Sequence, residues 1–230
     1  MLVSIILPTY NEKENIIQLV NTIHQELISF EHEIIVVDDN SPDGTFFELQ
    51  KNKTSYLNPL LRITERGLAK SVRCGIENAN GNIIVVMDSD FNHNPKHLPF
   101  MINAIEYYDF IAASRYTYGG GMYSIKRFYL SYCFNLFIRF ITASRLTDHL
   151  SGFFCVKKAT LEQFDFDKIF FGYGDYYLRL LFSIQRKKKN ILQFPVIYDL
   201  RLSGESKTRF VKTFFKYIYE TVKMVITFKK

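Results

Sequence analysis

The sequence of 230 residues contains no tryptophan and only three cysteines. Cys74, Cys133 and Cys155 lack the spacing of a metal-binding motif, and one thiol would stay unpaired after any disulfide formed. This cysteine usage excludes a disulfide-stabilised scaffold and is typical of a reducing compartment. Because apolar neighbours flank each cysteine, we expect buried and inert thiols.

Long apolar runs are also missing. No segment reaches the ~20 uninterrupted apolar residues that a membrane-spanning helix needs, and the first residues predict a strand rather than a signal peptide. The sequence shows no internal repeat, low-complexity tract or obvious linker. With 47% apolar and 23% charged residues, we expect one globular domain over residues 1–230.

Basic residues outnumber acidic ones by 29 to 23, which gives a formal net charge of +6. This excess favours an anionic partner without choosing among a nucleotide, a lipid phosphate and a nucleic acid. A nucleic-acid module is not expected, because no basic stripe with interleaved base-stacking aromatics is present. The basic run at residues 186–189 is interpreted as a solvated turn between a helix and a strand.

The first half of the chain alternates β-branched runs with amphipathic segments. Strands are predicted at residues 2–7, 33–37, 60–64, 82–87 and 110–113, and helices at residues 15–28, 67–79 and 96–105. Repeated strand–helix–strand units indicate an α/β fold with a mainly parallel sheet flanked by helices. The run at 82–87 is almost continuously apolar, as expected for a strand covered on both faces.

The second half is richer in aromatic residues. Helices are predicted at residues 128–143, 175–186 and 208–228, a strand at 151–157 and an extended stretch at 191–200. The helices at 128–143 and 208–228 mix aromatic, aliphatic and cationic residues, which is typical of amphipathic helices that lie in a membrane interface. Packing on the domain as ordinary core explains the same pattern, so both interpretations stay open.

Polar residues gather where four of the predicted strands end, at residues 8–12, 38–45, 88–92 and 114–115. In parallel sheets, ligands bind beyond the carboxyl ends of the strands. The four clusters therefore indicate a ligand site along one edge of the sheet.

Asp88 and Asp90, separated by Ser89, directly follow the apolar run at 82–87. Two carboxylates at a strand end can share Mg²⁺ or Mn²⁺, hard cations that prefer oxygen ligands and bridge to phosphates. Such a cation would neutralise a diphosphate leaving group. A solvated turn is the alternative for Asp-x-Asp taken alone, and the position after a buried strand favours the metal site.

Residues 38–45 follow another apolar run and combine Asp38, Asp39 and Asp43 with Asn, Ser, Pro and Gly. These residue types favour turns and helix starts, so a turn is one interpretation. The other is that Asp38 or Asp39 accepts hydrogen bonds from a nucleobase or a ribose.

In order and spacing, residues 8–12, 38–45 and 87–95 resemble the family 2 inverting glycosyltransferases, most closely the dolichol-phosphate mannosyltransferase branch. The resemblance continues at residues 66–68, 79–82, 114–116, 148–153, 201 and 204–207 and so covers nearly the whole chain. It implies the GT-A fold, which is Rossmann-like. It also implies a nucleotide-sugar-binding half at 1–115, an acceptor half at 116–207 and an amphipathic C-terminal helix at 208–230.

The resemblance further implies roles for individual residues. The nucleotide site would be formed by Pro8, Tyr10, Glu12, Asp38, Asp39, Asp43, Asp88 and Ser89. Asp90 would bind the metal ion directly, with Asp88 and Asn92 as further ligands. Arg115 and Arg127 would hold the acceptor phosphate, and Arg201 and Lys207 would lie on a loop near the phosphates. Guanidinium groups suit a phosphate because two of their N–H donors can engage one anion. A surface ion pair is the alternative for Arg115 and Arg127.

A phosphate acceptor changes what catalysis requires. An alcohol needs a general base, whereas a phosphate monoester is largely ionised at neutral pH and can attack without one. Asp148 and Asp175 are candidates for donor-sugar contacts, or for the base with a different acceptor. Two features depart from the family pattern: residues 69–73 are more basic than in relatives, and Asp175 stands near where many relatives carry Glu.

The function expected from the resemblance is metal-dependent, inverting transfer of a hexose, mannose from GDP-mannose first, to dolichyl or polyprenyl phosphate. The expected location is the cytoplasmic face of a membrane, the endoplasmic reticulum in a eukaryote or the plasma membrane in a prokaryote. Many relatives add spanning helices, so peripheral binding, a small membrane-anchoring partner and truncation are all open.

Three alternatives remain: a UDP-glucose-dependent transferase, a transferase with a glycan acceptor, and a non-enzymatic nucleotide-sugar-binding scaffold. A dinucleotide oxidoreductase is not expected, because no Gly-x-Gly-x-x-Gly follows the first strand.

Overall fold

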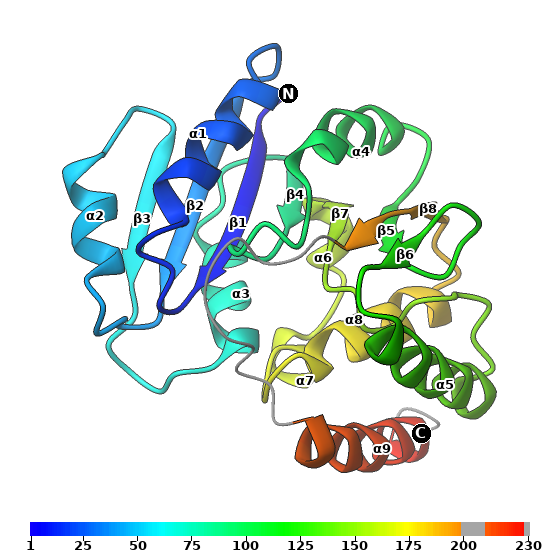
Figure 1. The fold of residues 1–230 in the computed structure, drawn as a ribbon. Helices are drawn as coiled ribbons and strands as arrows, with labels where there is room; N and C mark the ends of the chain where they lie inside the picture. Colours follow the sequence, from blue (N-terminus) through cyan, green and yellow to red (C-terminus); the bar gives the residue numbers. More distant parts are fainter. Residues whose placement is uncertain (199–209, 228–230) are drawn as a thin grey trace.

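The computed structural model describes residues 1–198 and 210–227, and a seven-stranded sheet forms its centre (Figure 1). The strands of this sheet are β1 (Val3–Thr9), β2 (His32–Asp38), β3 (Leu57–Leu61), β4 (Ile83–Val86), β5 (Phe110–Ser114), β7 (Phe154–Lys157) and β8 (Ile191–Pro195). Their spatial order is β3-β2-β1-β4-β7-β5-β8. A small second sheet pairs β6 (Gly121–Met122) with β9 (Ile197–Tyr198).

Strand direction decides where the polar ends of the strands lie. β1 runs parallel to β2 and β4, β2 runs parallel to β3, and β5 runs parallel to β8. β7 is antiparallel to both of its neighbours, β4 and β5. In this register Thr9 at the end of β1 lies beside Asp38 at the end of β2. The carboxyl ends of β1, β2 and β4 therefore meet at one edge of the sheet.

Helices cover both faces of the sheet. One face packs against α1 (Ile16–Glu26), α2 (Thr45–Lys51), α4 (Leu98–Ala104) and the short 3₁₀ helix η1 (Pro95–His97). The other packs against α3 (Leu68–Glu77), α6 (Lys158–Leu161), α7 (Phe166–Ile169) and α8 (Asp175–Arg186). Because both faces are covered, all seven residues of β1 are buried, as expected for a central parallel strand.

The helices α5 (Ile125–Thr142) and α9 (Phe210–Thr227) lie beyond the sheet, next to α8 (Figure 1). They share a separate apolar cluster with α8, formed by Phe134, Ile138, Leu178, Phe182 and Met224. Much of the remaining surface of α5 is exposed, including aromatic and aliphatic side chains. No helix in the described ranges has the length and apolar content to cross a membrane.

The predicted fold class is confirmed: the sheet is mainly parallel and flanked by helices. The strand predicted at 60–64 was misplaced, because β2 pairs with residues 57–61 instead. The prediction also missed the short helices α2, α6 and α7. The basic run at 186–189 does join α8 to β8, as expected.

The expectation of buried cysteines is correct for only one of the three. Cys155 is buried in β7, Cys74 on α3 is half-buried, and Cys133 is exposed on α5. The apolar neighbours of Cys133 misled the prediction, because α5 turns part of its apolar surface outward instead of into a core.

Gly75 allows α3 to approach the sheet closely. A Cβ atom built at this position would lie 2.4 Å from Cγ2 of Ile6, which is fully buried in β1. We expect Gly75→Ala to lower the free energy of unfolding by about 1–3 kcal/mol, because overpacking outweighs the gain in helix propensity. Urea unfolding measures the change. The matched control is Gly121→Ala, whose Cβ would meet no atom within 4 Å; a similar loss in both variants would contradict this explanation.

Candidate active site

A cavity of about 830 Å³ opens at the carboxyl edge of the sheet. Its lining includes eight of the residues singled out in the sequence: Pro8, Tyr10, Glu12, Asp39, Asp88, Ser89, Asp90 and Arg115. Pro8 lies near the end of β1, and the other seven residues belong to the segments that follow β1, β2, β4 and β5, which are far apart in the chain. The predicted gathering of polar strand ends is therefore present in the structure.

Asp39 is held by a network at the entrance to α3. Its carboxylate accepts a hydrogen bond from the backbone N–H of Gly67 at 2.9 Å and forms an ion pair with Arg62. Arg62 also donates to Oγ of Ser71 at 2.8 Å. Asp39 and Ser71 both line the cavity, so this network fixes a carboxylate on its wall.

Asp38 and Asp43 do not line the cavity and instead shape the loop that carries Asp39. Asp38 accepts hydrogen bonds from the backbone N–H and the hydroxyl of Ser41, and burial still raises its pKa above the ordinary value. Asp43 begins α2 by accepting from the backbone N–H of Thr45 at 2.9 Å and from its hydroxyl at 2.6 Å. Burial by itself would raise the pKa of Asp43, but these hydrogen bonds outweigh it and lower the pKa below the ordinary value.

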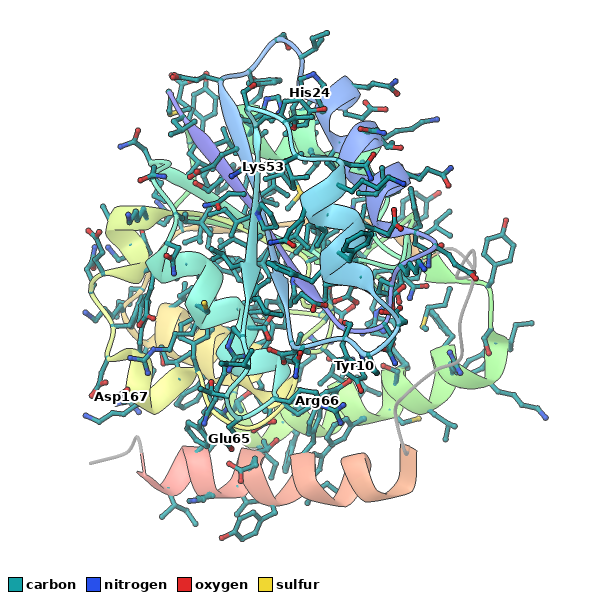
Figure 2. All side chains as sticks on the ribbon, turned by 90° about the vertical axis from the view of Figure 1, so that its left-hand side faces the viewer. Tyr10, His24, Lys53, Glu65, Arg66 and Asp167 are labelled. Atoms are coloured by element: carbon teal, nitrogen blue, oxygen red, sulfur yellow. The ribbon has the colours of Figure 1, made fainter. Side chains whose placement is uncertain are left out.

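Tyr10 and Arg66 form one side of the cavity. The guanidinium carbon of Arg66 lies 4.2 Å from the centre of the Tyr10 ring, a cation–π distance. Figure 2 shows the two side chains next to each other, at the opposite end of the molecule from His24. Glu12 accepts a hydrogen bond from the amide of Asn15 at 3.0 Å, while its backbone N–H donates to Thr45.

The turn after β4 carries the two carboxylates predicted to bind a metal ion. Asp90 is 3% exposed and accepts hydrogen bonds from the backbone N–H of Asn92 at 3.1 Å and from its amide at 2.8 Å. The Asp88 side chain is 45% exposed. Ser89 donates to the carbonyl oxygen of Pro8 at 3.1 Å, which ties this turn to the end of β1.

These two carboxylates fit a hard divalent cation that also binds a phosphate. Among residues 1–198 and 210–227, no group of three His, Cys, Asp or Glu side chains is placed to hold a metal ion by itself. A cation such as Mg²⁺ commonly uses only one or two carboxylates and completes its shell with water and substrate phosphates. Asn92 turns its amide N–H toward Asp90 and does not line the cavity.

Arg115 reaches the cavity from the end of β5 and is held by Asp148. Its Nε and Nη2 atoms donate to the two carboxylate oxygens of Asp148 at 2.7 and 2.8 Å, and both side chains are buried. Burial alone would lower the pKa of Arg115 and raise that of Asp148, but their mutual attraction shifts each the other way. Asp148 itself lies behind Arg115 and does not line the cavity.

Asp175 also stands behind the cavity wall, although residues 172–174 beside it line the cavity. Its carboxylate accepts from the backbone N–H of Tyr173 at 2.8 Å and pairs with Arg179 at 2.5 Å. Gly172 has a φ angle of +75°, and a Cβ there would lie 2.9 Å from the Asp175 carboxylate. Asp175 therefore shapes this part of the wall.

The other three predicted cations are Arg127, Arg201 and Lys207. Arg127 is exposed on α5 and is not among the lining residues. Arg201 and Lys207 lie outside the described residues. Their predicted contacts with phosphates remain predictions.

Other lining residues were not given a role from the sequence. They include Arg66, Leu68, Leu130, Phe134, Leu150, Tyr173, Tyr176, Tyr177 and Tyr217. Residues 66–68 formed part of the resemblance, so the sequence could have predicted Arg66 and Leu68 as site residues. No sequence feature pointed to Tyr217 on α9, because only the packing of α9 beside α5 and α8 brings it to the cavity.

A family model described as glycosyl transferase family 2 matches residues 4–170. The chain is 34% identical over 225 residues to a Pyrococcus furiosus protein named dolichol-phosphate mannosyltransferase, a match that covers 95% of this chain and 62% of that protein. It is 32% identical over 216 residues to a Micrococcus luteus protein named undecaprenyl-phosphate mannosyltransferase, covering 90% and 87%. The chain thus spans less than two thirds of the length of the first of these relatives.

The fold is also similar to that of glucosyl-3-phosphoglycerate synthase from Mycobacterium tuberculosis, solved in complex with Mn²⁺, uridine diphosphate and phosphoglyceric acid. The TM-score is 0.74 at 16% identity, over 97% of this chain and 78% of that one. At this identity the likeness concerns the fold alone, and it confirms the expected GT-A-like arrangement.

His149, next to Asp148, predicts a pH dependence of stability. Its backbone N–H donates to Asn135 at 2.7 Å and its Nε2 lies 2.7 Å from Oγ of Ser144. Burial lowers the pKa of His149 from 6.5 to about 4. Between these values the unfolded chain binds more protons than the folded one, so stability falls as the pH decreases.

We expect the free energy of unfolding to lose about 2 kcal/mol between pH 7.5 and pH 5 through His149, at about 1.4 kcal/mol for each pH unit below the unfolded pKa. His149→Gln removes this contribution, although it lowers stability at pH 7.5. Urea unfolding at the two pH values measures the difference. An equal loss in both proteins would show that His149 is not the group responsible.

Proposed function

The chain belongs to the glycosyl transferase family 2, and we propose that it transfers a hexose from a nucleoside diphosphate sugar to a polyprenyl phosphate at a membrane surface. The observation that carries the proposal is the cavity that brings together Asp39, the Asp88–Asp90 turn and Arg115. Carboxylates suited to a nucleoside and a divalent cation stand there beside a cation for a second phosphate. The names of the mannosyltransferase relatives support mannose as the hexose. GDP-mannose is proposed as the donor on the resemblance in the sequence alone.

The donor's nucleoside would lie between the loops that follow β1 and β2. Asp39 is an acceptor fixed on the cavity wall and suits the hydroxyls of a ribose or the N–H groups of a base. Tyr10, beside Arg66, offers a flat surface for a base, and Glu12 a further carboxylate. Asp38 and Asp43 would act indirectly, by holding the loop in its shape.

Asp88 and Asp90 are the residues that would hold Mg²⁺ or Mn²⁺, because both line the cavity and offer only oxygen ligands. When bound, the cation neutralises charge on the diphosphate leaving group. Asn92 is proposed as a further ligand through its amide oxygen, for which the amide must turn, since its N–H now donates to Asp90. In its present orientation Asn92 fixes the Asp90 carboxylate.

Arg115 would hold the acceptor phosphate. The acceptor's phosphate oxygen forms a bond to the anomeric carbon, while the bond from that carbon to the diphosphate oxygen breaks and the diphosphate leaves with the electron pair. No proton has to move, because the acceptor is already largely ionised at neutral pH. Attack opposite the leaving group converts an α-linked donor into a β-linked product.

This chemistry relies on positioning two anions against their mutual repulsion. Asp148 serves it by fixing the Arg115 fork, and Asp175 by shaping the wall at residues 172–174. Arg201 and Lys207 are proposed as further cations for the phosphates. A catalytic base is not required of any of these residues.

The acceptor lipid would reach the cavity along α5. Leu130 lines the cavity and is also 53% exposed, so the cavity opens toward the outer surface of this helix. Exposed apolar side chains continue along α5 and α9, and include Tyr129, Leu136, Phe140, Tyr219, Val222 and Ile226. Lys126 and Arg127 are exposed on α5 among them. Such a mixture suits the interface of a membrane that contains anionic lipids.

Transfer itself is tested with radiolabelled GDP-mannose and, in parallel, UDP-glucose, each with a polyprenyl phosphate in detergent and with Mg²⁺, Mn²⁺ or EDTA. We expect label in the lipid phase from GDP-mannose, loss of that label with EDTA, and a decrease of about 100-fold or more in Asp90→Ala. Asp167→Ala, at an exposed aspartate paired with Arg73, is the control and should keep its activity.

Productive transfer from UDP-glucose alone would assign a different sugar to the same site. Failure of both donors with the folded protein would reject a lipid phosphate as the acceptor.

Membrane binding is tested by cosedimentation with vesicles that contain anionic lipid. We expect Phe140→Ser to weaken binding about 10-fold, because the Phe140 side chain is 85% exposed on α5 and would lose its burial in the interface. Phe47→Ser, at a phenylalanine that is 67% exposed on α2, should bind as the wild type does. Equal weakening of both variants would argue against α5 as the docking surface.

A further inference from the structure

His93 is a buried histidine whose contacts the donor and acceptor sites do not explain. It is 1% exposed and its ring stacks on Phe153, with 4.8 Å between the ring centres. Its ring accepts a hydrogen bond from the backbone N–H of Asp88 and so closes the turn that carries Asp88 and Asp90. The position of the ring can therefore fix the conformation of that turn.

The hydrogen bonds of His93 have defined directions. The backbone N–H of Asp88 donates to Nδ1 of His93 at 2.9 Å, so Nδ1 is the acceptor. A neutral imidazole then carries its proton on Nε2. Nε2 lies 2.7 Å from the hydroxyl oxygen of Tyr198 and donates to it.

Tyr198 extends these contacts to the other side of the cavity. Its hydroxyl donates to the carbonyl oxygen of Ser151 at 2.8 Å and lies 2.7 Å from the Ser151 hydroxyl. Ser151 lines the cavity in the loop before β7. The guanidinium carbon of Arg115 lies 4.8 Å from the centre of the Tyr198 ring. Tyr198 thus contacts His93 beside the Asp88–Asp90 turn and also Ser151 and Arg115 on the other side of the cavity.

We propose that His93 and Tyr198 are positioning residues that couple the Asp88–Asp90 turn, on the donor side of the cavity, to Ser151 and Arg115 on the acceptor side. The inference rests on the proposed function for the meaning of the two sides. The route runs from the backbone N–H of Asp88 through His93 and Tyr198 to Ser151. Through it, the Asp88 carboxylate keeps its place relative to the arginine that would hold the second phosphate.

The transfer reaction explains why such a coupling would be useful. Transfer needs the diphosphate and the attacking phosphate at a fixed separation, and misplacement of either by about 1 Å costs roughly 100-fold in rate. A purely structural role for His93 would affect stability alone. A positioning role affects metal-dependent nucleotide binding and turnover in a protein that remains folded.

Two substitutions break the same bond from opposite ends. Tyr198→Phe keeps the ring under Arg115 and removes the hydroxyl. His93→Asn keeps an acceptor for the Asp88 N–H, because the amide oxygen replaces Nδ1, but does not reach Tyr198. Tyr116→Phe is the matched control, since its ring also lies near Arg115, at 5.3 Å, but packs on Phe128 and Tyr132 of α5.

The main readout is binding of GDP and of UDP with and without Mn²⁺, measured by calorimetry, beside kcat and each KM. We expect each of the two substitutions to weaken Mn²⁺-dependent nucleotide binding about 5- to 10-fold, the usual worth of one buried hydrogen bond. Both substitutions remove the His93–Tyr198 bond, and Tyr198→Phe also removes the contacts of the hydroxyl with Ser151. The double variant should therefore lose less binding than the sum of the two single losses. Tyr116→Phe should stay within about twofold of the wild type.

A second readout needs no ligand. The chain has five histidines, so the ring nitrogens of His93 can be followed by NMR in histidine-labelled protein. We expect a protonated Nε2 and an unprotonated Nδ1 in the wild type, and a changed Nε2 signal in Tyr198→Phe. This measurement, together with thermal unfolding, reports on the bond even if one variant folds poorly.

Wild-type nucleotide binding in both folded variants, or fully additive losses in the double variant, would overturn the coupling. These outcomes differ from a failure of the proposed function. If the wild type binds nucleotide with Mn²⁺ but transfers nothing to polyprenyl phosphate, the acceptor is rejected while the coupling stands. If the variants bind and transfer as the wild type does, the coupling is rejected while the function stands.

Discussion

The pairing of β1 between β2 and β4, all in one direction, is the constraint on which the site depends. It brings the loops after three separate strands to the same edge of the sheet, although they are far apart in the sequence. Burial of β1 on both faces fixes its register, because a shift by one residue would exchange the side chains that face the two helical layers. Donor-side groups as different as Tyr10, Asp39 and Asp88 then share one cavity.

Two of the charges at this edge are fixed by ion pairs before any ligand arrives. Arg62 holds Asp39 and Asp148 holds Arg115, and neither Arg62 nor Asp148 itself lines the cavity. A buried ion pair gives little net stability, because desolvation offsets the attraction, and its value here is in orientation. The price of such an arrangement is that removing one partner leaves a buried charge uncompensated. Fixed charges suit a reaction in which two anions must be held close together.

The sheet and the polar strand ends were predictable because they depend on local patterns. β-branched runs are followed directly by Asp, Asn and Ser, and parallel topology brings such ends together. The roles of single residues were harder to predict, because adjacent carboxylates can face different ways. Asp39 lines the cavity while its neighbour Asp38 turns to Ser41. Asp148, predicted to contact the donor sugar, instead pairs with Arg115 and does not line the cavity. Tyr217 and the outward side of α5 depend on helix–helix packing, which a single sequence does not specify.

The central claim is that the edge formed by β1, β2 and β4 binds a nucleoside diphosphate through a divalent cation. A crystal structure of the protein grown with Mn²⁺ and GDP, with an anomalous difference map at the manganese absorption edge, tests it directly. The account predicts one anomalous peak within bonding distance of the Asp90 carboxylate, with diphosphate oxygens in the same coordination shell and the ribose near Asp39. Nucleotide bound away from Asp39, or manganese bound away from Asp88 and Asp90, would contradict it.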